Sequence, residues 1–171
     1  MNLFIYFLMS LLGIFHQTYP TLKSYHSDKI MNFIFARLPK SGTLRKDGRG
    51  MVYVKVDNNY ILKLIEFIKQ EGFEVPPYFG EGLHGAHITV MTPEELLYYA
   101  VKDIQECGHS VRFEPKECKV VHPDTWAPGE LAYLITVEAP LLQDLRKKYG
   151  MPENKYAFHI TVGVRSRAFL K

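Results

Sequence analysis

The apolar positions between residues 51 and 91 predict a strand, a helix, a loop and a second strand. Within residues 51–56, valine recurs at every second position (Val52, Val54 and Val56), which is the pattern of a strand. Apolar residues then recur at three- and four-residue intervals up to Gly72, and this spacing predicts a helix. After a loop over residues 73–81, the short β-branched run at 85–91 predicts another strand.

Residues 131–164 follow the same plan. A strand is expected over 131–137, a short helix over 140–149 with Leu141, Leu142 and Leu145 on its inner face, and a strand over 157–164. These two series predict an α+β fold that is bilobal and built from duplicated strand-helix-strand units. Antiparallel-rich sheets would line a central cleft, with the helices outside.

Four further segments lie outside these units. A strand is expected over 32–37, and the basic segment 38–50 is expected to be a loop. Residues 92–108 begin with the signature of a capping box and predict a helix that ends at Gly108. The apolar face of that helix is expected at Leu96, Leu97, Ala100, Val101 and Ile104. Residues 109–121 predict a strand interrupted at Pro115.

We expect residues 31–171 to form a single globular domain, with its core over residues 50–165. The chain is 47% hydrophobic and 23% charged, and its net charge of +3 permits a phosphate-bearing substrate without requiring one. Two cysteines, Cys107 and Cys118, form no zinc-site pattern, and they would pair only in an exported protein. We expect a monomer with no cofactor and no metal.

Residues 1–30 form a separate N-terminal segment with an apolar run over 3–15. That run is short for a stable membrane span and lacks a preceding basic residue. Three interpretations remain open: an atypical signal or anchor, a cytosolic extension, or an upstream start with Met31 as the true beginning. A cytoplasmic location is favoured, and the alternative is secretion or membrane anchoring through residues 1–20.

The tetrapeptide His-Ile-Thr-Val occurs twice, at residues 87–90 and 159–162. Random placement of seven histidines and eight threonines would give roughly 0.3 His-x-Thr matches, so two matches inside strand-like runs exceed chance. Side chains alternate across a strand, so His and Thr of each copy share one face and the two apolar residues share the other. Each copy therefore presents an imidazole beside a hydroxyl.

Two imidazoles and two hydroxyls in one cleft suit phosphodiester cleavage. One neutral imidazole can take a proton from water, and a protonated one can give a proton to the leaving oxygen. The hydroxyls of Thr89 and Thr161 can donate hydrogen bonds to the phosphate oxygens, where charge develops. His87 and His159 are thus the candidate catalytic residues, and no carboxylate cluster suggests a metal.

Over about residues 50–165, the chain resembles the 2H phosphoesterase superfamily, whose members carry two His-x-Thr-x strands. That superfamily includes RNA 2′,3′-cyclic phosphodiesterases and enzymes that cut 2′,5′-oligoadenylate. The resemblance implies a metal-independent phosphodiesterase acting on a cyclic or 2′,5′-linked nucleotide, with RNA 2′,3′-cyclic phosphate ends favoured. By similarity to the hydrolytic members, His159 would activate water and His87 would protonate the leaving oxygen. The fourth motif position, often large and apolar in the family, is Val90 or Val162 here.

Several other residues are candidates for substrate contact. Arg165 is a candidate phosphate ligand, expected on the face of His159 and Thr161. An aromatic side chain can stack on any nucleobase, so such a contact holds a nucleotide with little preference for its base. The stacking candidates are Tyr78, Phe79, Trp126 and Tyr133. The alternative function is a non-catalytic nucleotide- or RNA-binding module that uses the same cleft.

Overall fold

The computed structural model describes residues 27–124 and 126–166. Its helices and strands, in chain order, are α1 (Ser27–Arg37), β1 (Ser41–Lys46), β2 (Val52–Lys55), α2 (Asn59–Leu62), α3 (Ile65–Ile68), the 3-10 turn η1 (Lys69–Glu71), β3 (His87–Met91), α4 (Pro93–Tyr98), β4 (Ser110–Arg112), β5 (Glu114–Val121), β6 (Leu131–Glu138), α5 (Pro140–Lys148) and β7 (His159–Arg165). Almost all of the N-terminal segment 1–30 lies outside the described residues. Across 27–124 and 126–166, no helix has the length and apolar character to cross a membrane.

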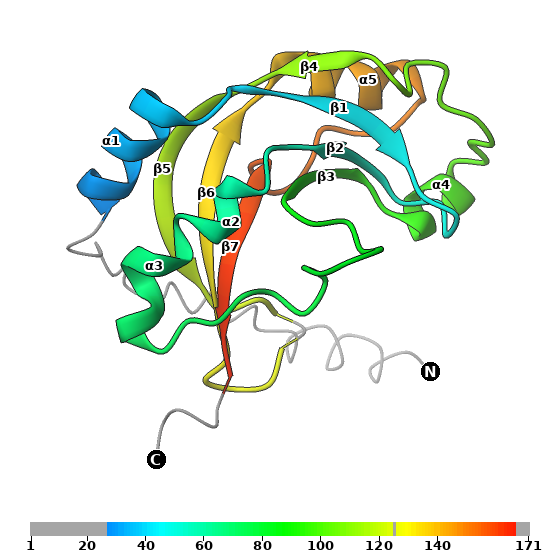
Figure 1. Cartoon of the computed structure of the whole chain (residues 1–171). Coiled ribbons are helices and arrows are strands. Elements are labelled where there is room, and N and C mark those ends of the chain that lie inside the picture. Colours follow the sequence, from blue (N-terminus) through cyan, green and yellow to red (C-terminus); the bar gives the residue numbers. More distant parts are fainter. Residues whose placement is uncertain (1–26, 125, 167–171) are drawn as a thin grey trace, which may run out of the picture.

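All seven strands form one curled sheet in the order β4-β1-β2-β3-β7-β6-β5, with antiparallel pairing throughout (Figure 1). The α+β class and the antiparallel pairing are confirmed. The expectation of separate sheets is wrong, because β3 and β7 join the two halves into a continuous sheet. Outward from this pair, the order is β3-β2-β1-β4 on one side and β7-β6-β5 on the other, so both predicted signature strands are central.

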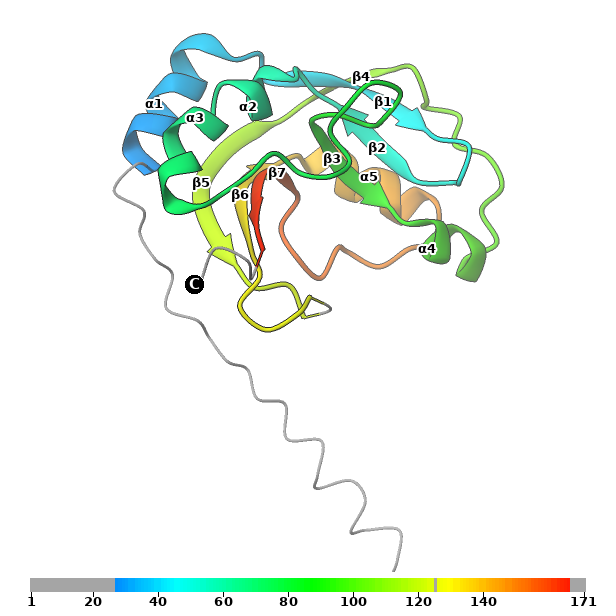
Figure 2. The same ribbon diagram turned by 60° about the horizontal axis from the view of Figure 1, so that its bottom comes forward.

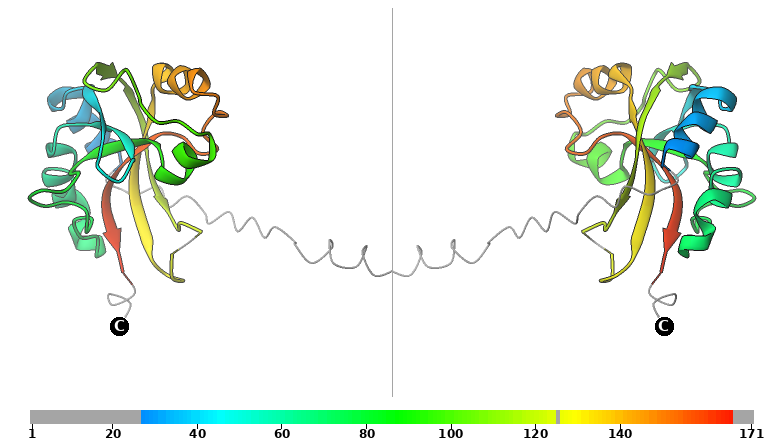
Figure 3. Two further views of the ribbon diagram at one scale, coloured as in Figure 1. Left: turned by 90° about the vertical axis from the view of Figure 1, so that its right-hand side faces the viewer. Right: turned by 90° about the vertical axis from the view of Figure 1, so that its left-hand side faces the viewer.

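The helices pack on the sheet from two sides. In both views of Figure 3, α1, α2 and α3 lie on one side of β5, β6 and β7, and α5 lies on the other. α1 packs against β5, α2 and α3 contact β7, and α5 contacts β3. The apolar residues of the two signature strands are buried in the same core: Ile88 and Ile160 are 0% exposed, and Val90 and Val162 are 1% and 0% exposed. The expected division of each signature strand into a core face and a polar face is therefore confirmed.

Two N-terminal predictions are wrong. Residues 32–37 belong to helix α1, which begins at Ser27 and buries Ile30 and Ile34, one helical turn apart. The basic segment expected to be a loop contains strand β1, which pairs with β2 and β4. Phe33, Ile34 and Phe35 resemble a strand when residues 32–37 are taken alone, because about half of helix α1 lies before residue 32.

Helix α4, which Thr92 caps, is much shorter than predicted. Its capping box is present: the Glu95 N–H donates to the Thr92 hydroxyl, and the Thr92 N–H donates to the Glu95 carboxylate. α4 nevertheless ends at Tyr98, because Ala100 adopts a left-handed conformation (φ 52°) and the Val101 N–H bonds back to the Leu96 carbonyl. Leu97, expected in the core, is 83% exposed.

Two other helices differ in detail from the prediction. The helix expected over 57–72 is divided into α2, α3 and η1, and it ends at Gly72 with φ 82° as the glycine signal predicted. α5 is present where expected, but Leu141 is 60% exposed, and Arg146, at 2%, is buried instead.

Candidate functional site

Strands β3 and β7 pair antiparallel, with Ile88 directly opposite Ile160. In antiparallel pairing this register sets His87 opposite Thr161 and Thr89 opposite His159. The two histidines are then diagonal neighbours on one face, a relation in which side chains start about 7–8 Å apart. We call this surface, which carries His87, Thr89, His159 and Thr161, the site face.

Both motif imidazoles are held in the same way. Nδ1 of His87 lies 2.7 Å from the carbonyl oxygen of Gly85, and Nδ1 of His159 lies 3.0 Å from that of Ala157. A carbonyl oxygen can only accept, so Nδ1 carries the hydrogen in each ring. The Nδ1 hydrogen bond thus fixes the tautomer, and it leaves Nε2 of each neutral ring as the basic nitrogen.

His87 is enclosed by aromatic rings. The rings of Tyr53 and Tyr78 meet its ring edge to face, at centroid distances of 5.7 and 5.0 Å, and the His84 ring is 5.5 Å away. Burial lowers the pKa of His87 below its usual 6.5; the Gly85 hydrogen bond opposes this shift, and the positive charges of His84, Lys55 and His159 add to it. His87 therefore favours the neutral form.

Gly85 is needed for this arrangement. It has φ 65°, and a Cβ atom there would collide with the Lys55 ammonium and the Asn58 amide oxygen. Nζ of Lys55 donates to Asn58 Oδ1 (2.8 Å) and to the carbonyl of His84 (2.6 Å). The ammonium thus holds the loop before β3 close to β2, in the position where the Gly85 carbonyl orients His87.

His84 is a third histidine at the site, and its position in the sequence gave no sign of this role. Its Nε2 lies 2.7 Å from Oδ2 of Asp47, and its ring meets that of Tyr53 edge to face at 5.0 Å. Burial alone would raise the pKa of Asp47, but hydrogen bonds from His84 and from the N–H groups of Met51 and Arg49 hold it below its usual value. No motif signals this pair, because Asp47 and His84 come from two separate loops.

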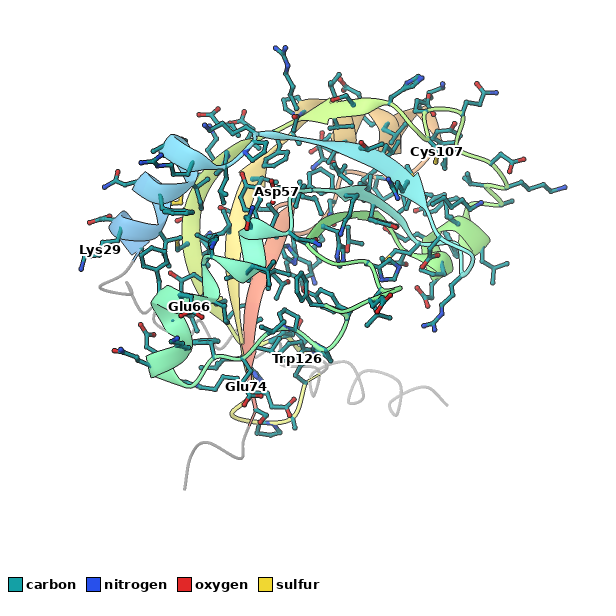
Figure 4. The ribbon with its side chains drawn as sticks, viewed as in Figure 1. Lys29, Asp57, Glu66, Glu74, Cys107 and Trp126 are labelled. Atoms are coloured by element: carbon teal, nitrogen blue, oxygen red, sulfur yellow. The ribbon has the colours of Figure 1, made fainter. Side chains whose placement is uncertain are left out.

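His159 lies at the edge of a large cavity on the other side of the site. The cavity has a volume of about 750 Å³ and is formed by β5, β6, β7 and the loops between them. Its lining residues are Lys119, Val120, Val121, His122, Pro123, Asp124, Trp126, Ala132, Leu134, Thr136, Tyr156, Ala157, His159 and Thr161. Figure 4 shows Trp126 beside the lower end of β7, and Figure 1 shows the loop that carries it between β5 and β6.

Tyr78 connects the two sides of the site. The segment between η1 and β3, which carries it, runs past β7 in Figure 2. Its side chain is hydrogen-bonded to that of Thr161, while its ring contacts the ring of His87. Burial raises the pKa of the Tyr78 hydroxyl, and the bond to Thr161 partly offsets the rise. Tyr78 therefore lies at the motif residues, between the His87 side and the cavity side.

The remaining candidates separate into two groups. Trp126 lines the cavity with His159 and Thr161, whereas Phe79 is partly buried against the hydrophobic core. Tyr133 is fully buried and packs edge to face on Phe73 at 5.6 Å, so the prediction that it stacks a nucleobase is wrong.

Arg165 also differs from expectation. The pairing of β6 with β7 shifts register between Tyr133 and Leu134, so the simple alternation that placed Arg165 beside Thr161 is interrupted. Its Nη1 donates to the Glu71 carbonyl at 3.0 Å, and its guanidinium lies 5.3 Å from the centroid of the Phe73 ring. These contacts attach the end of β7 to the turn after α3.

Within the part of the chain that the structure describes, no three side chains of His, Cys, Asp or Glu are grouped as a metal site would require. Cys107 and Cys118 are both free thiols.

The chain matches the family model of the "Swiss Army Knife" 2H phosphoesterase domain over residues 52–169. This match covers more than half of the chain and both His-x-Thr-x strands, so the protein belongs to the 2H phosphoesterase superfamily. It matches no curated protein and no solved structure. The resemblance inferred from the two motifs is confirmed at the level of the family.

Proposed function

We propose that the protein is a metal-independent phosphodiesterase in which His87 and His159 form a general acid/base pair. The Ile88–Ile160 register carries the proposal, because it sets both imidazoles on one face of adjacent strands. The matching Nδ1 hydrogen bonds support it, since they leave Nε2 of each ring for proton transfer. Membership of the 2H phosphoesterase superfamily supports phosphodiester hydrolysis as the reaction class.

Thr89 and Thr161 are the proposed phosphate ligands. Each lies on the site face, opposite the histidine of the other motif, so each hydroxyl can reach a phosphate held between the imidazoles. Arg165 is not included, because its guanidinium contacts Glu71 and Phe73.

The proposed substrate is a cyclic or 2′,5′-linked nucleotide, with RNA 2′,3′-cyclic phosphate ends preferred. The aromatic Trp126 in a cavity beside His159 supports a nucleotide, because a nucleobase can stack on an exposed aromatic ring. Ligand cavities of this size accept molecules as large as a nucleotide.

The test is hydrolysis of a 2′,3′-cyclic nucleotide, of an RNA ending in 2′,3′-cyclic phosphate and of a 2′,5′-linked dinucleotide, each with excess chelator. We expect turnover of at least one substrate by the wild-type protein, and a loss of about 100-fold or more in Thr89→Val, which keeps the shape but removes a donor. Loss of activity in chelator would overturn metal independence. Saturable nucleotide binding without any turnover would instead identify a binding module.

A further inference from the structure

The two motif histidines lie in unequal surroundings. His87 is packed by Tyr53, Tyr78 and His84, whereas His159 opens onto the cavity of about 750 Å³. The hydrogen bond from His159 to Ala157 is exposed, and that from His87 to Gly85 is partly buried. Within the described residues, the cavity lining includes His159 and Thr161 but neither His87 nor Thr89.

This asymmetry restricts how a phosphodiester can lie between the histidines. Hydrolysis in line places the attacking water on one side of phosphorus and the leaving oxygen on the opposite side. In a 2′,3′-cyclic nucleotide the leaving oxygen belongs to the ribose, so the ribose and its base must lie on the leaving side. Water needs little space, but a nucleoside needs a cavity.

We infer that the nucleoside occupies the cavity beside His159 and that the attacking water lies at His87, so that His87 is the base and His159 the acid. This inference rests on the proposed function and reverses the roles suggested by the family resemblance. The lowered pKa of His87 agrees with it, because a base must be neutral before it accepts a proton.

The reaction then balances as the addition of water across one P–O bond. The water oxygen attacks phosphorus, and a water proton passes to Nε2 of His87. The bond from phosphorus to the ribose oxygen breaks, and the proton on Nε2 of His159 moves to that oxygen. The product is a nucleoside phosphomonoester, and exchange with solvent returns both imidazoles to their starting states.

The cavity has the chemistry of a nucleoside site. Ala132 and Leu134 supply an apolar surface, and Trp126 and Tyr156 supply aromatic ones. Asp124, which accepts a hydrogen bond from the Tyr156 hydroxyl at 3.2 Å, adds an acceptor for a base edge. An aromatic, partly polar ring is the group that such a lining binds best.

Trp126 is the only tryptophan in the sequence, so its fluorescence reports the cavity directly. We expect adenosine 2′-monophosphate, a hydrolysis product, to change the emission saturably, and ribose 5-phosphate, which lacks a base, to leave it almost unchanged. Trp126→Ala should raise the KM for a 2′,3′-cyclic nucleotide about 10-fold with little change in kcat. The matched control is Tyr98→Ala, an aromatic residue 82% exposed on α4. Nucleotide binding detected by calorimetry without any emission change would overturn the cavity assignment.

The pH dependence of kcat/KM, measured under single-turnover conditions in each histidine variant, distinguishes the base from the acid. Each single alanine variant should retain measurable activity, because loss of one acid or base costs about 10²- to 10⁴-fold. His159→Ala retains the base, so its rate should still rise with pH; His87→Ala should lose that rise. A rise retained in His87→Ala and lost in His159→Ala would overturn the assignment. If the wild-type protein neither binds nor hydrolyses any nucleotide, the proposed function itself fails.

Discussion

Ile88 and Ile160 lie directly opposite each other where β3 meets β7, and both side chains are fully buried. They are the central residue pair between two motifs that carry the candidate chemistry on their other face. Because side chains alternate along a strand, burying these isoleucines turns His87, Thr89, His159 and Thr161 toward the site. The hydrophobic core and the site geometry therefore depend on the same register.

Replacing Ile160 with alanine should weaken the join between the two halves of the sheet. We expect a loss of about 3 kcal/mol in the free energy of unfolding, because the variant loses buried methyl groups and leaves a cavity. Urea unfolding followed by circular dichroism measures it. Leu141→Ala is the matched control, since Leu141 is 60% exposed and should change stability by less than about 0.5 kcal/mol. Equal effects in the two variants would contradict the packing described.

Arg146 attaches α5 to β3 and α4. Its Nη1 donates to the Val90 carbonyl at 2.7 Å, its Nη2 pairs with Glu95 Oε1 at 2.6 Å, and its Nε donates to the Pro152 carbonyl at 3.1 Å. Arg146→Ala leaves the two carbonyls without this donor and removes the charged partner of the Glu95 carboxylate, which keeps its bond from the Thr92 N–H, so we expect a loss of about 3 kcal/mol.

The control for Arg146 is Lys147→Ala, which removes an exposed ion pair with Glu153. Exposed pairs contribute about 0–1 kcal/mol, so this variant should unfold at nearly the wild-type urea midpoint. A wild-type midpoint in Arg146→Ala as well would show that the buried network does not stabilise the fold.

The pH profile of kcat/KM should reflect the surroundings of His87. With His87 as the base, activity rises as its proton is lost, so the acidic limb should lie below pH 6.5, in the direction of its lowered pKa. His84→Gln removes a neighbouring positive charge that opposes protonation of His87. The pKa of His87 then rises, and the acidic limb should move to higher pH.

His109→Gln provides the comparison for that shift, because His109 is exposed immediately before β4. The acidic limb of the kcat/KM profile of His109→Gln should coincide with that of the wild-type protein. A limb in His84→Gln that is unchanged or moves to lower pH would show that His84 does not act on His87 through its charge.

The motif strands could be predicted from the sequence, whereas the residues that enclose His87 could not. His-Ile-Thr-Val is a local pattern whose alternation specifies a buried and an exposed face, and the structure confirms that division. The enclosure of His87 depends on Asp47, Tyr53 and His84, which long-range pairing brings together from separate segments. No spacing along the chain encodes that contact.

Local propensity also failed where tertiary contacts decide the outcome. Ser41–Lys46 forms a strand despite its basic residues, because β2 and β4 supply backbone partners on both sides. Tyr133 is an aromatic residue of the kind that can stack on a nucleobase. However, β6 is buried on both faces along most of its length, and the Tyr133 ring packs on Phe73. The burial of a strand's second face depends on elements that its own sequence does not specify.

The most direct test of the two-histidine mechanism is turnover of a 2′,3′-cyclic nucleotide by His87→Ala, His159→Ala and the double variant, in the presence of chelator. Both imidazoles would act on one transition state, so each single variant should lose about 100-fold or more of the wild-type kcat, and the double variant should lose less than the product of the two factors. Circular dichroism confirms that each variant is folded. Wild-type turnover in either single variant would contradict the mechanism.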